Sequence, residues 1–362
     1  MMVVSKQYQI FFDFLGFCIG SESEIPSSLK EADWKELYRI AQKQCLVGIL
    51  FDGIQKLLPA EVGMSKDLLL QWMMQCQMLE KANVRLNDAA IQVSEWFRKK
   101  GFRTCILKGQ GNALMYPNPY SRTPGDIDIW VEGGDSRVIS FVRSISPHEK
   151  ACYHHIEFPS YKGVEVEVHY RPSFLLCFWH NRKLQKYYER VKEEQFSHRV
   201  MLGEQGEIAI PTVEFNLIFQ LTHIYAHLMN EGIGLRQLLD YYYVLISDDL
   251  LLIRDRVQKE LKELGLWKFA GAIMYIMQEV FGMPASRLIV PPNEKYGRFV
   301  LNEVLEAGNF GKHDKRNCFG RSKLGHNLQR VYRDMRLVRY FPAEALCEPL
   351  FRVWHFFWRK SR

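Results

Sequence analysis

The sequence lacks the features that mark secreted and membrane-spanning proteins. No stretch approaches the roughly 18 uncharged apolar residues of a membrane span. The apolar run at the N-terminus is interrupted by Asp13 and is followed by no small-residue cleavage site, so we expect no signal peptide. Internal repeats and low-complexity tracts are absent too. These absences indicate a soluble globular protein.

Cysteine occurs, but never as a CxxC pair. The eight cysteines are scattered, and most lie within apolar runs, where a thiol usually serves as a small core residue: Cys18, Cys45, Cys76, Cys105, Cys152, Cys177, Cys318 and Cys347. A disulfide scaffold or a zinc site is therefore disfavoured. The pattern predicts a reduced, cytoplasmic protein.

Positive charge is concentrated at the C-terminal end. Residues 312–362 contain thirteen Lys and Arg against four Asp and Glu, an excess of +9, whereas the whole chain has a net charge of +7. Arginines recur there every three residues, at Arg330, Arg333, Arg336 and Arg339. We expect a solvated helix face, with an RNA or polyphosphate contact as the alternative. The aromatic segment VWHFFWRK at 353–360 is expected to dock a terminal amphipathic helix onto the core rather than to touch a membrane.

The spacing of apolar residues divides the chain into three parts. Apolar residues return every three to four positions over residues 33–99 and again from Pro211 onward, which predicts helices, and Gly101 ends the first helical part. Between them, residues 102–170 contain short segments of period two and a predicted helix at 136–145, and the segment PSYKG at 159–163 is expected to form a turn between the last two of these segments. We therefore predict an α+β fold with a small mixed sheet at residues 101–205, flanked by helical regions at 1–100 and 206–362.

Two acids lie close together in a strand that otherwise looks buried, GDIDIWV at 125–131. Residues two apart in a strand face the same side, so Asp126 and Asp128 are neighbours. The same rule aligns Glu165, Glu167 and His169 in VEVEVHY. Adjacent carboxylates repel unless a cation lies between them, and such oxygen ligands suit Mg²⁺ or Mn²⁺. Acids that simply face solvent are the alternative for this motif taken alone.

A second motif, ILKGQGNALMYP at 106–117, carries residues suited to phosphate. Lys108 supplies a positive charge, and Gly109 and Gly111 are expected to leave backbone N–H groups free at a helix start, which attracts anions. Arg122 is expected within reach of a phosphate, and Gly125 to let the chain come close before the acidic strand. The spacing is not that of a P-loop.

In combination, the motifs LKG, GDIDIWV, VEVEVHYRP and LTHIYAH with GLRQLLDYYYVL resemble the uncharacterised nucleotidyltransferase family, a branch of the polymerase β-like nucleotidyltransferase superfamily. The resemblance runs from Asp33 to Asp240 and more faintly beyond. It implies a minimal sheet in which a glycine-bearing helix start binds the triphosphate. Two acids of the DxD strand and a third acid on a neighbouring strand would bind two Mg²⁺.

The resemblance assigns roles position by position. Asp126, Asp128 and Glu167 match the catalytic and metal-binding acids, and Lys108 with Gly109 matches the family's KG pair. We assign Arg122, Gly125 and His169 to nucleotide binding as well. Gln110 stands where the superfamily usually has a serine, so Lys108 or Arg122 is expected to make that triphosphate contact instead.

The implied reaction is the transfer of an NMP group from an NTP to an acceptor, with release of pyrophosphate and dependence on Mg²⁺ or Mn²⁺. Glu167 is a candidate to accept the proton of the acceptor. The acceptor itself stays open: a small molecule, a sugar, a protein side chain or tRNA.

Two other functions are compatible with the sequence. One is a non-catalytic nucleotide-binding or antitoxin-like module. The other is a metal-dependent hydrolase built on His223, His227 and Asp240, although the glutamate of an HExxH motif is missing because position 224 is Ile. Arg236, four positions before Asp240, is expected to form an ion pair with it. Of His154 and His155, only one can face the same side as Glu167.

Overall fold

A four-stranded sheet organises the middle of the chain in the computed structural model, which describes residues 5–57, 63–204, 206–316, 319 and 323–362. Its strands are β1 (Thr104–Ile106), β2 (Ile127–Val131), β3 (His155–Tyr161) and β4 (Val164–His169). The order is β1-β2-β4-β3, with β2 and β4 parallel and the two outer pairs antiparallel. The predicted α+β fold with a small mixed sheet is confirmed.

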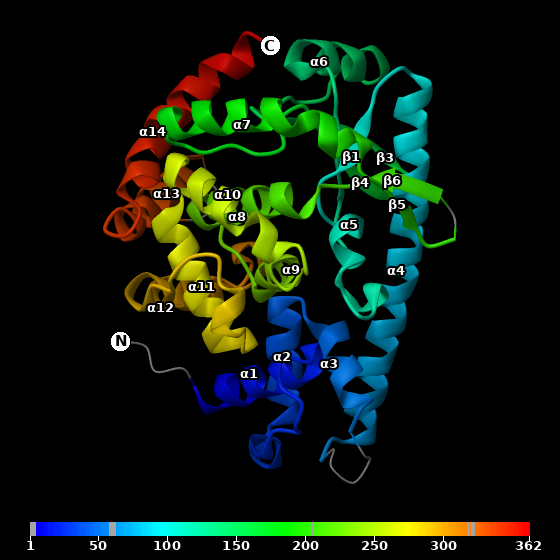
Figure 1. The fold of residues 1–362 in the computed structure, drawn as a ribbon, viewed down its shortest axis with the longest axis vertical. Helices are drawn as coiled ribbons and strands as arrows, with labels where there is room; N and C mark the ends of the chain where they lie inside the picture. Colours follow the sequence, from blue (N-terminus) through cyan, green and yellow to red (C-terminus); the bar gives the residue numbers. More distant parts are fainter. Residues whose placement is uncertain (1–4, 58–62, 205, 317–318, 320–322) are drawn as a thin grey trace.

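Helices come before, around and after the sheet (Figure 1). Before it in the chain are α1 (Lys6–Ile19), α2 (Trp34–Gln44), α3 (Val47–Ile54) and α4 (Lys66–Lys99). Within the central part are α5 (Gln110–Ala113), α6 (Gly134–Ile145), α7 (Phe178–Ser197) and a separate hairpin of β5 (Arg199–Leu202) and β6 (Gly206–Ala209). After it come α8 (Val213–Asn230), α9 (Leu235–Leu245), α10 (Leu250–Glu263), α11 (Trp267–Phe281), α12 (Glu294–Ala307), α13 (Lys323–Leu337) and α14 (Pro342–Lys360). Short 3-10 turns lie at Ser27–Glu31, Pro119–Ser121, Ala285–Arg287 and Asn309–Gly311.

Helix α4 links two hydrophobic cores. Ser65 caps its start by accepting from the Leu68 amide, and Gly101, with φ +81°, follows its end as expected. Trp72 in its first half is buried in the core of the surrounding helices, whereas Phe97 in its second half is buried with the sheet and α6. Helix α4 thus packs on both the N-terminal helices and the sheet, and Figure 1 shows it running past both.

The structure corrects two local expectations. The segment PSYKG was expected as a turn, but β3 continues to Tyr161 past an irregularity in its pairing, and only Lys162 and Gly163, both with positive φ, form the turn. Helix α7 and the β5–β6 hairpin were not predicted. Because α7 carries charged residues on most of its surface, its apolar period is weak.

The C-terminal region also differs in part from expectation. Helix α14 does dock onto the core, where the Phe351 ring stacks on that of Phe174 at 5.1 Å between centroids. The four arginines do not form a solvated face, because Arg333 is buried and Arg336 pairs with Glu303 at 3.3 Å. Among the described residues no helix combines the length and apolar composition needed to cross a bilayer.

Candidate active site

The two acids of GDIDIWV lie at the start of β2, at the centre of the sheet. Ile127 and Ile129 point into the core under the sheet, which turns Asp126 and Asp128 to the opposite face. Asp128 is 2% exposed, and Asp126, just before the strand, is half-buried. The alternative that both acids simply face solvent is therefore wrong.

The third acid comes from the neighbouring parallel strand. The register of β2 and β4 places Glu167 directly beside Asp128 and His169 beside Trp130. Glu165 is exposed, whereas Val166 and Val168 on the other face are buried. The carboxylate oxygens of Asp126, Asp128 and Glu167 lie within 4.8 Å of one another. The acids that the sequence singled out therefore form one cluster.

The cluster has the chemistry of a hard-cation site. It offers only carboxylate oxygens, the ligands that Mg²⁺ and Mn²⁺ prefer. Oδ2 of Asp128 is buried and has no hydrogen-bond partner among the described residues. A buried carboxylate oxygen without a partner is costly, and a cation between the acids would satisfy it. The residues therefore fit a divalent metal ion.

Lys108 already places one positive charge against this cluster. Its Nζ lies 3.1 Å from Asp128 Oδ1 and 3.0 Å from His223 Nε2. Burial opposes the charge of the ammonium group, but Asp128, Asp126 and Glu167 outweigh it and raise the pKa of Lys108. Lys108 therefore stays protonated beside the acids.

The protonation of the acids follows from their neighbours. The charge of Asp128, together with burial, raises the pKa of Asp126. Burial works against the charge of Asp128, yet Lys108 and a hydrogen bond from His169 bring its pKa well below the usual range. Burial likewise opposes a charged His169, but its contacts with Asp128 at 3.0 Å and Glu167 at 3.4 Å raise the pKa of His169 to about 9. His169 is thus a second cation beside the cluster.

Two further histidines continue the polar cluster beyond Glu167. His155 Nδ1 lies 3.5 Å from Glu167 Oε2 and 3.0 Å from His154 Nε2. Burial and the charge of His169 lower the pKa of His155 to about 4, so it is neutral. Of the pair, His155 is the residue on the side of Glu167. His154 Nδ1 is buried without a hydrogen-bond partner in the part of the chain that the structure describes.

His223 and His227 do contact each other, but they do not form a metal site with Asp240. Their Nε2 atoms lie 2.9 Å apart, and His227 Nδ1 lies 3.1 Å from Glu231 Oε1. Burial and the charge of Lys108 hold the pKa of His223 well below its usual range. In the described part of the chain, Asp240 joins neither histidine in a group with metal-ligand spacing.

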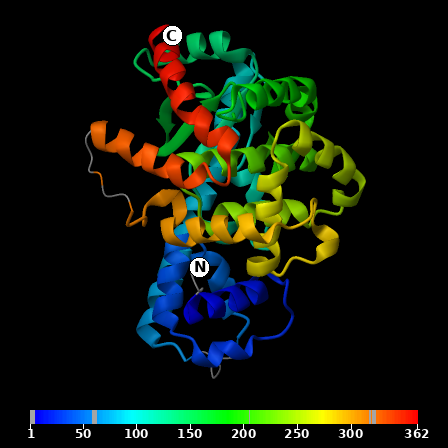
Figure 2. The ribbon, with the colours of Figure 1, turned by 90° about the vertical axis from the view of Figure 1, so that its left-hand side faces the viewer.

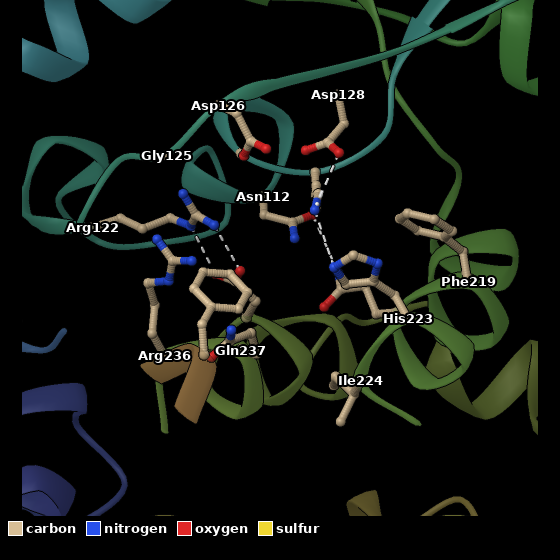
Figure 3. A pocket seen from close by; sticks show the side chains of 15 residues that line it. Asn112, Arg122, Gly125, Asp126, Asp128, Phe219, His223, Ile224, Arg236 and Gln237 are labelled. Carbon is tan, nitrogen blue, oxygen red and sulfur yellow. Dashed lines mark hydrogen bonds and ion pairs between the residues drawn. The ribbon is translucent and has the colours of Figure 1, made fainter. Parts of the chain in front are cut away.

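Asp240 forms an ion pair, although not with the predicted partner. Arg122 donates through Nε and Nη2 to the two carboxylate oxygens, each at 2.8 Å, and the Tyr116 hydroxyl donates to Oδ1 at 2.6 Å. Arg236 instead donates to the carbonyl oxygen of Thr123 at 3.0 Å. The predicted Arg236–Asp240 pair is therefore wrong. The guanidinium of Arg122, held by Asp240, lines a small cavity beside Asp126 and Asp128 (Figure 3).

The glycines differ in how far they match their expected roles. Gly109 has φ +62°, which side chains rarely adopt, and it precedes α5 as predicted. Gly111 does not leave its N–H free, because that group donates to the Lys108 carbonyl at 3.3 Å. At Gly125 a Cβ would meet only Arg236 Nη1 at 3.7 Å, an ordinary contact, so the expected close approach is absent.

Two cavities meet at the acids. A small one of about 30 Å³ lies on the side of Gly109, Arg122 and Asp240 (Figure 3). A larger one of about 510 Å³ lies on the other side, and Lys108, Asp126, Asp128, His223 and Phe310 line both. Only the larger one has the size of a typical small-molecule site.

The far wall of the larger cavity contains residues that no sequence motif assigned to the site. It is formed by side chains of α13 and α14, namely Arg330, Glu348, Phe351, Arg352 and His355. Of these, only Arg330, from the arginine series, and His355, from the segment VWHFFWRK, drew notice in the sequence, and neither was expected near the acids. Long-range packing brings them over the acids.

A family profile covers most of the chain. The profile of the family described as "Uncharacterised nucleotidyltransferase" matches residues 30–282, well over half of the chain, and the chain belongs to this family. A search of curated proteins finds no match. Among solved structures, an antigenic nucleotidyltransferase-like protein from Paracoccidioides brasiliensis is similar at 16% identity and a TM-score of 0.28, over 50% of this chain and 92% of that one. Family membership rests on the profile.

Proposed function

We propose that this protein is a polymerase β-like nucleotidyltransferase, which transfers an NMP group from an NTP to an acceptor and releases pyrophosphate. The observation that carries the proposal is the cluster of Asp126, Asp128 and Glu167, whose oxygens lie within 4.8 Å of one another next to Lys108. Family membership supports the same reaction class.

In this proposal the three acids hold Mg²⁺ or Mn²⁺. When bound, the metal neutralises the phosphate charge and stabilises the attacking and leaving oxygens. Lys108, next to Asp128, and Gly109, before α5, are assigned to the triphosphate. His169 keeps Asp128 and Glu167 in place through its contacts with both. A serine at position 110 would contact the triphosphate, and Gln110 stands there instead. We assign this contact to Lys108, because Arg122 is already held by Asp240.

The acceptor's oxygen or nitrogen attacks the α-phosphorus. The bond from phosphorus to the bridging oxygen of the leaving group breaks, and pyrophosphate departs. Glu167 accepts the acceptor's proton in this proposal, because its carboxylate lines the larger cavity. Positioning and charge neutralisation supply most of the catalysis.

The acceptor is assigned to the larger cavity, whose volume of about 510 Å³ suits a small molecule, a sugar, a protein side chain or the end of a tRNA. The RNA contact through the C-terminal arginines stays a prediction, and of the four only Arg330 and Arg339 are exposed. We also infer a reduced, cytoplasmic setting, since each of the seven described cysteines is free, Cys318 lying outside the described residues.

The test is incorporation of label from each α-labelled NTP into fractions of a cell extract, with Mg²⁺ or Mn²⁺ present. We expect one NTP to label one fraction and the Asp126→Asn and Asp128→Asn variants to label none. If the protein binds nucleotide but transfers label to none of the fractions, the non-catalytic module is favoured instead. Full activity in the purified double variant would contradict the proposal.

A further inference from the structure

Helix α14 carries a row of apolar residues on its outer side. Leu346, Leu350, Val353 and Phe357 are spaced by four, three and four positions and so share one helix face. Their exposed fractions are 65%, 63%, 60% and 63%. A surface helix usually buries such a face. Here it points to solvent.

The inward face of α14 contains two buried acids beside the buried Phe351, and the contacts of Glu344 explain why the helix does not turn over. Glu344 is 3% exposed and accepts hydrogen bonds from the amides of Leu176 at 2.6 Å and Cys177 at 3.3 Å. Glu348, also 3% exposed, lies 3.4 Å from Arg352 Nη2. Rotating α14 would leave the buried amides of Leu176 and Cys177 without their acceptor Glu344, which is more costly than exposing apolar side chains.

Helix α13, which packs against α14, shows the same inversion. Its Arg333 and Asp334 are buried. Its exposed side carries four apolar or aromatic residues at helical spacing, Leu328, Val331, Tyr332 and Met335, which are 40% to 70% exposed. We call these four, together with Leu346, Leu350, Val353 and Phe357, the α13–α14 outer face.

The exposed charges of α13, α14 and the junction between them have one sign. The acids of α13 and α14, Asp334, Glu344 and Glu348, are all buried. The exposed charges include Arg339, Arg359 and Lys360, and no acid among the described residues forms an ion pair with Arg359 or Lys360. The outer face is thus apolar and flanked by cations, which selects an anionic partner.

Exposed aromatic side chains adjoin α14. Trp179, at the start of α7, is 78% exposed, and the ring of its neighbour Phe178 lies 6.0 Å from that of Trp354. Figure 1 shows α14 at the edge of the molecule, and in Figure 2, viewed from that side, no other element lies in front of it. Exposed tryptophan next to an apolar and cationic helix face is typical of proteins that bind at the membrane interface.

We propose that the α13–α14 outer face docks the protein peripherally onto an anionic lipid bilayer, independently of nucleotide transfer. Its aliphatic side chains enter the interface, and Arg339, Arg359 and Lys360 meet acidic headgroups. A second copy of this face fits less well, because pairing would bring cations together without exposed acids to balance them. RNA also fits less well, since single-stranded RNA is bound by stacking aromatics in a basic groove rather than by leucine and valine.

The test is co-sedimentation of the full chain with vesicles of phosphatidylcholine alone and with about a quarter phosphatidylserine. We expect binding to the anionic vesicles that weakens with salt. In the variant L346S/L350S/V353S/F357S the partition coefficient should fall about tenfold or more. The matched control is L251S/L252S on α10, whose side chains are 64% and 78% exposed, and it should bind like the unchanged protein.

Each outcome is decisive. Circular dichroism and thermal unfolding of the four-serine variant show whether it is folded, and R359Q/K360Q, which leaves the apolar face intact, should weaken anionic binding alone. The proposal is overturned if the unchanged protein binds neither vesicle, or if the four-serine variant still binds. It is likewise overturned if the chain is a dimer in solution that L350S dissociates, since a second copy would then cover the face.

Discussion

The ammonium group of Lys108 lies 3.1 Å from Asp128 Oδ1, so a side chain that follows β1 holds a positive charge against the acids of β2. The acids come from two parallel strands, whereas the lysine comes from the turn before α5. A metal cation bound by the acids would be repelled by the nearby ammonium group of Lys108, because both are positively charged. The occupant of the site and the position of Lys108 are therefore coupled.

This coupling predicts opposite effects of Lys108→Gln on metal and nucleotide. Removing the ammonium group leaves the acids less neutralised, so the affinity for Mn²⁺ without nucleotide should rise several-fold. The affinity for NTP should fall, because the phosphate loses a cation. Isothermal titration with Mn²⁺ and with NTP measures both. Lys99→Gln, at an exposed site on α4, should change neither, and a joint fall of both affinities would count against the coupling.

Two glutamates on β4 provide a matched comparison of acid chemistry. Glu167 belongs to the acid cluster, whereas Glu165, two positions earlier, is exposed. Glu167→Gln should reduce kcat for nucleotide transfer by about a thousandfold, because the variant would lose the proposed metal ligand and proton acceptor. Glu165→Gln should keep kcat within about twofold of the unchanged protein. Equal effects of the two changes would remove the special role of Glu167.

The buried pair of Arg122 and Asp240 should be important for stability. Asp240→Asn leaves the Arg122 guanidinium, 4% exposed, without its counter-charge, so we expect a loss of about 3–5 kcal/mol in the free energy of unfolding. Urea denaturation measures it. Glu294→Gln breaks an exposed pair with Arg298 at 2.8 Å and should cost about 0.5 kcal/mol or less. A similar small loss at Asp240 would show that the buried charge is satisfied in another way.

Stability should depend on pH through Asp334. Burial and the neighbouring Glu348 raise the pKa of Asp334 from 3.8 to about 7. Between these two pH values the folded protein holds a proton on Asp334 that the unfolded chain has lost. The contribution of Asp334 to the free energy of unfolding therefore declines as pH rises from 3.8 to about 7. Asp334→Asn should remove the decline.

The comparison with Asp334→Asn is needed because other groups titrate nearby. His355, whose pKa burial lowers to about 4, has the opposite effect below pH 6.5, and the raised pKa of His169 acts between 6.5 and about 9. Urea unfolding of both proteins at several pH values isolates the Asp334 contribution as their difference. Parallel pH profiles for the two proteins would refute the prediction.

The sequence predicts the part of the site that depends on strand geometry. Period two alone predicts that Asp126 and Asp128 share one face of their strand, and it aligns Glu165, Glu167 and His169 on another strand. That Glu167 joins the two aspartates was implied by the family resemblance, and the pairing of β2 with β4 brings the three acids together. The KG turn could be found in the same way, since Gly109 does adopt a positive φ. These are local properties, which a motif records directly.

Contacts between distant segments could not be predicted. Asp240 lies four positions from Arg236, and the helical rule favours that pair, but Arg122 from a loop far away in the chain makes the bidentate contact. The exposed apolar row of α14 was likewise not foreseen, because Glu344 satisfies two backbone amides that become buried only in the folded protein. Partners remote in sequence decide both cases.

The pairing of Asp128 with Glu167 in the register of β2 and β4 has one more consequence. Hydrogen bonds between β2 and β4 hold Asp128 and Glu167 side by side. The chain that connects the two acids, through α6 and β3, is not what keeps them together. A protease cut at the exposed Lys162–Gly163 turn would thus leave the acids in place. The protein should tolerate being assembled from two fragments divided at that turn, with nucleotide transfer retained in the reconstituted complex.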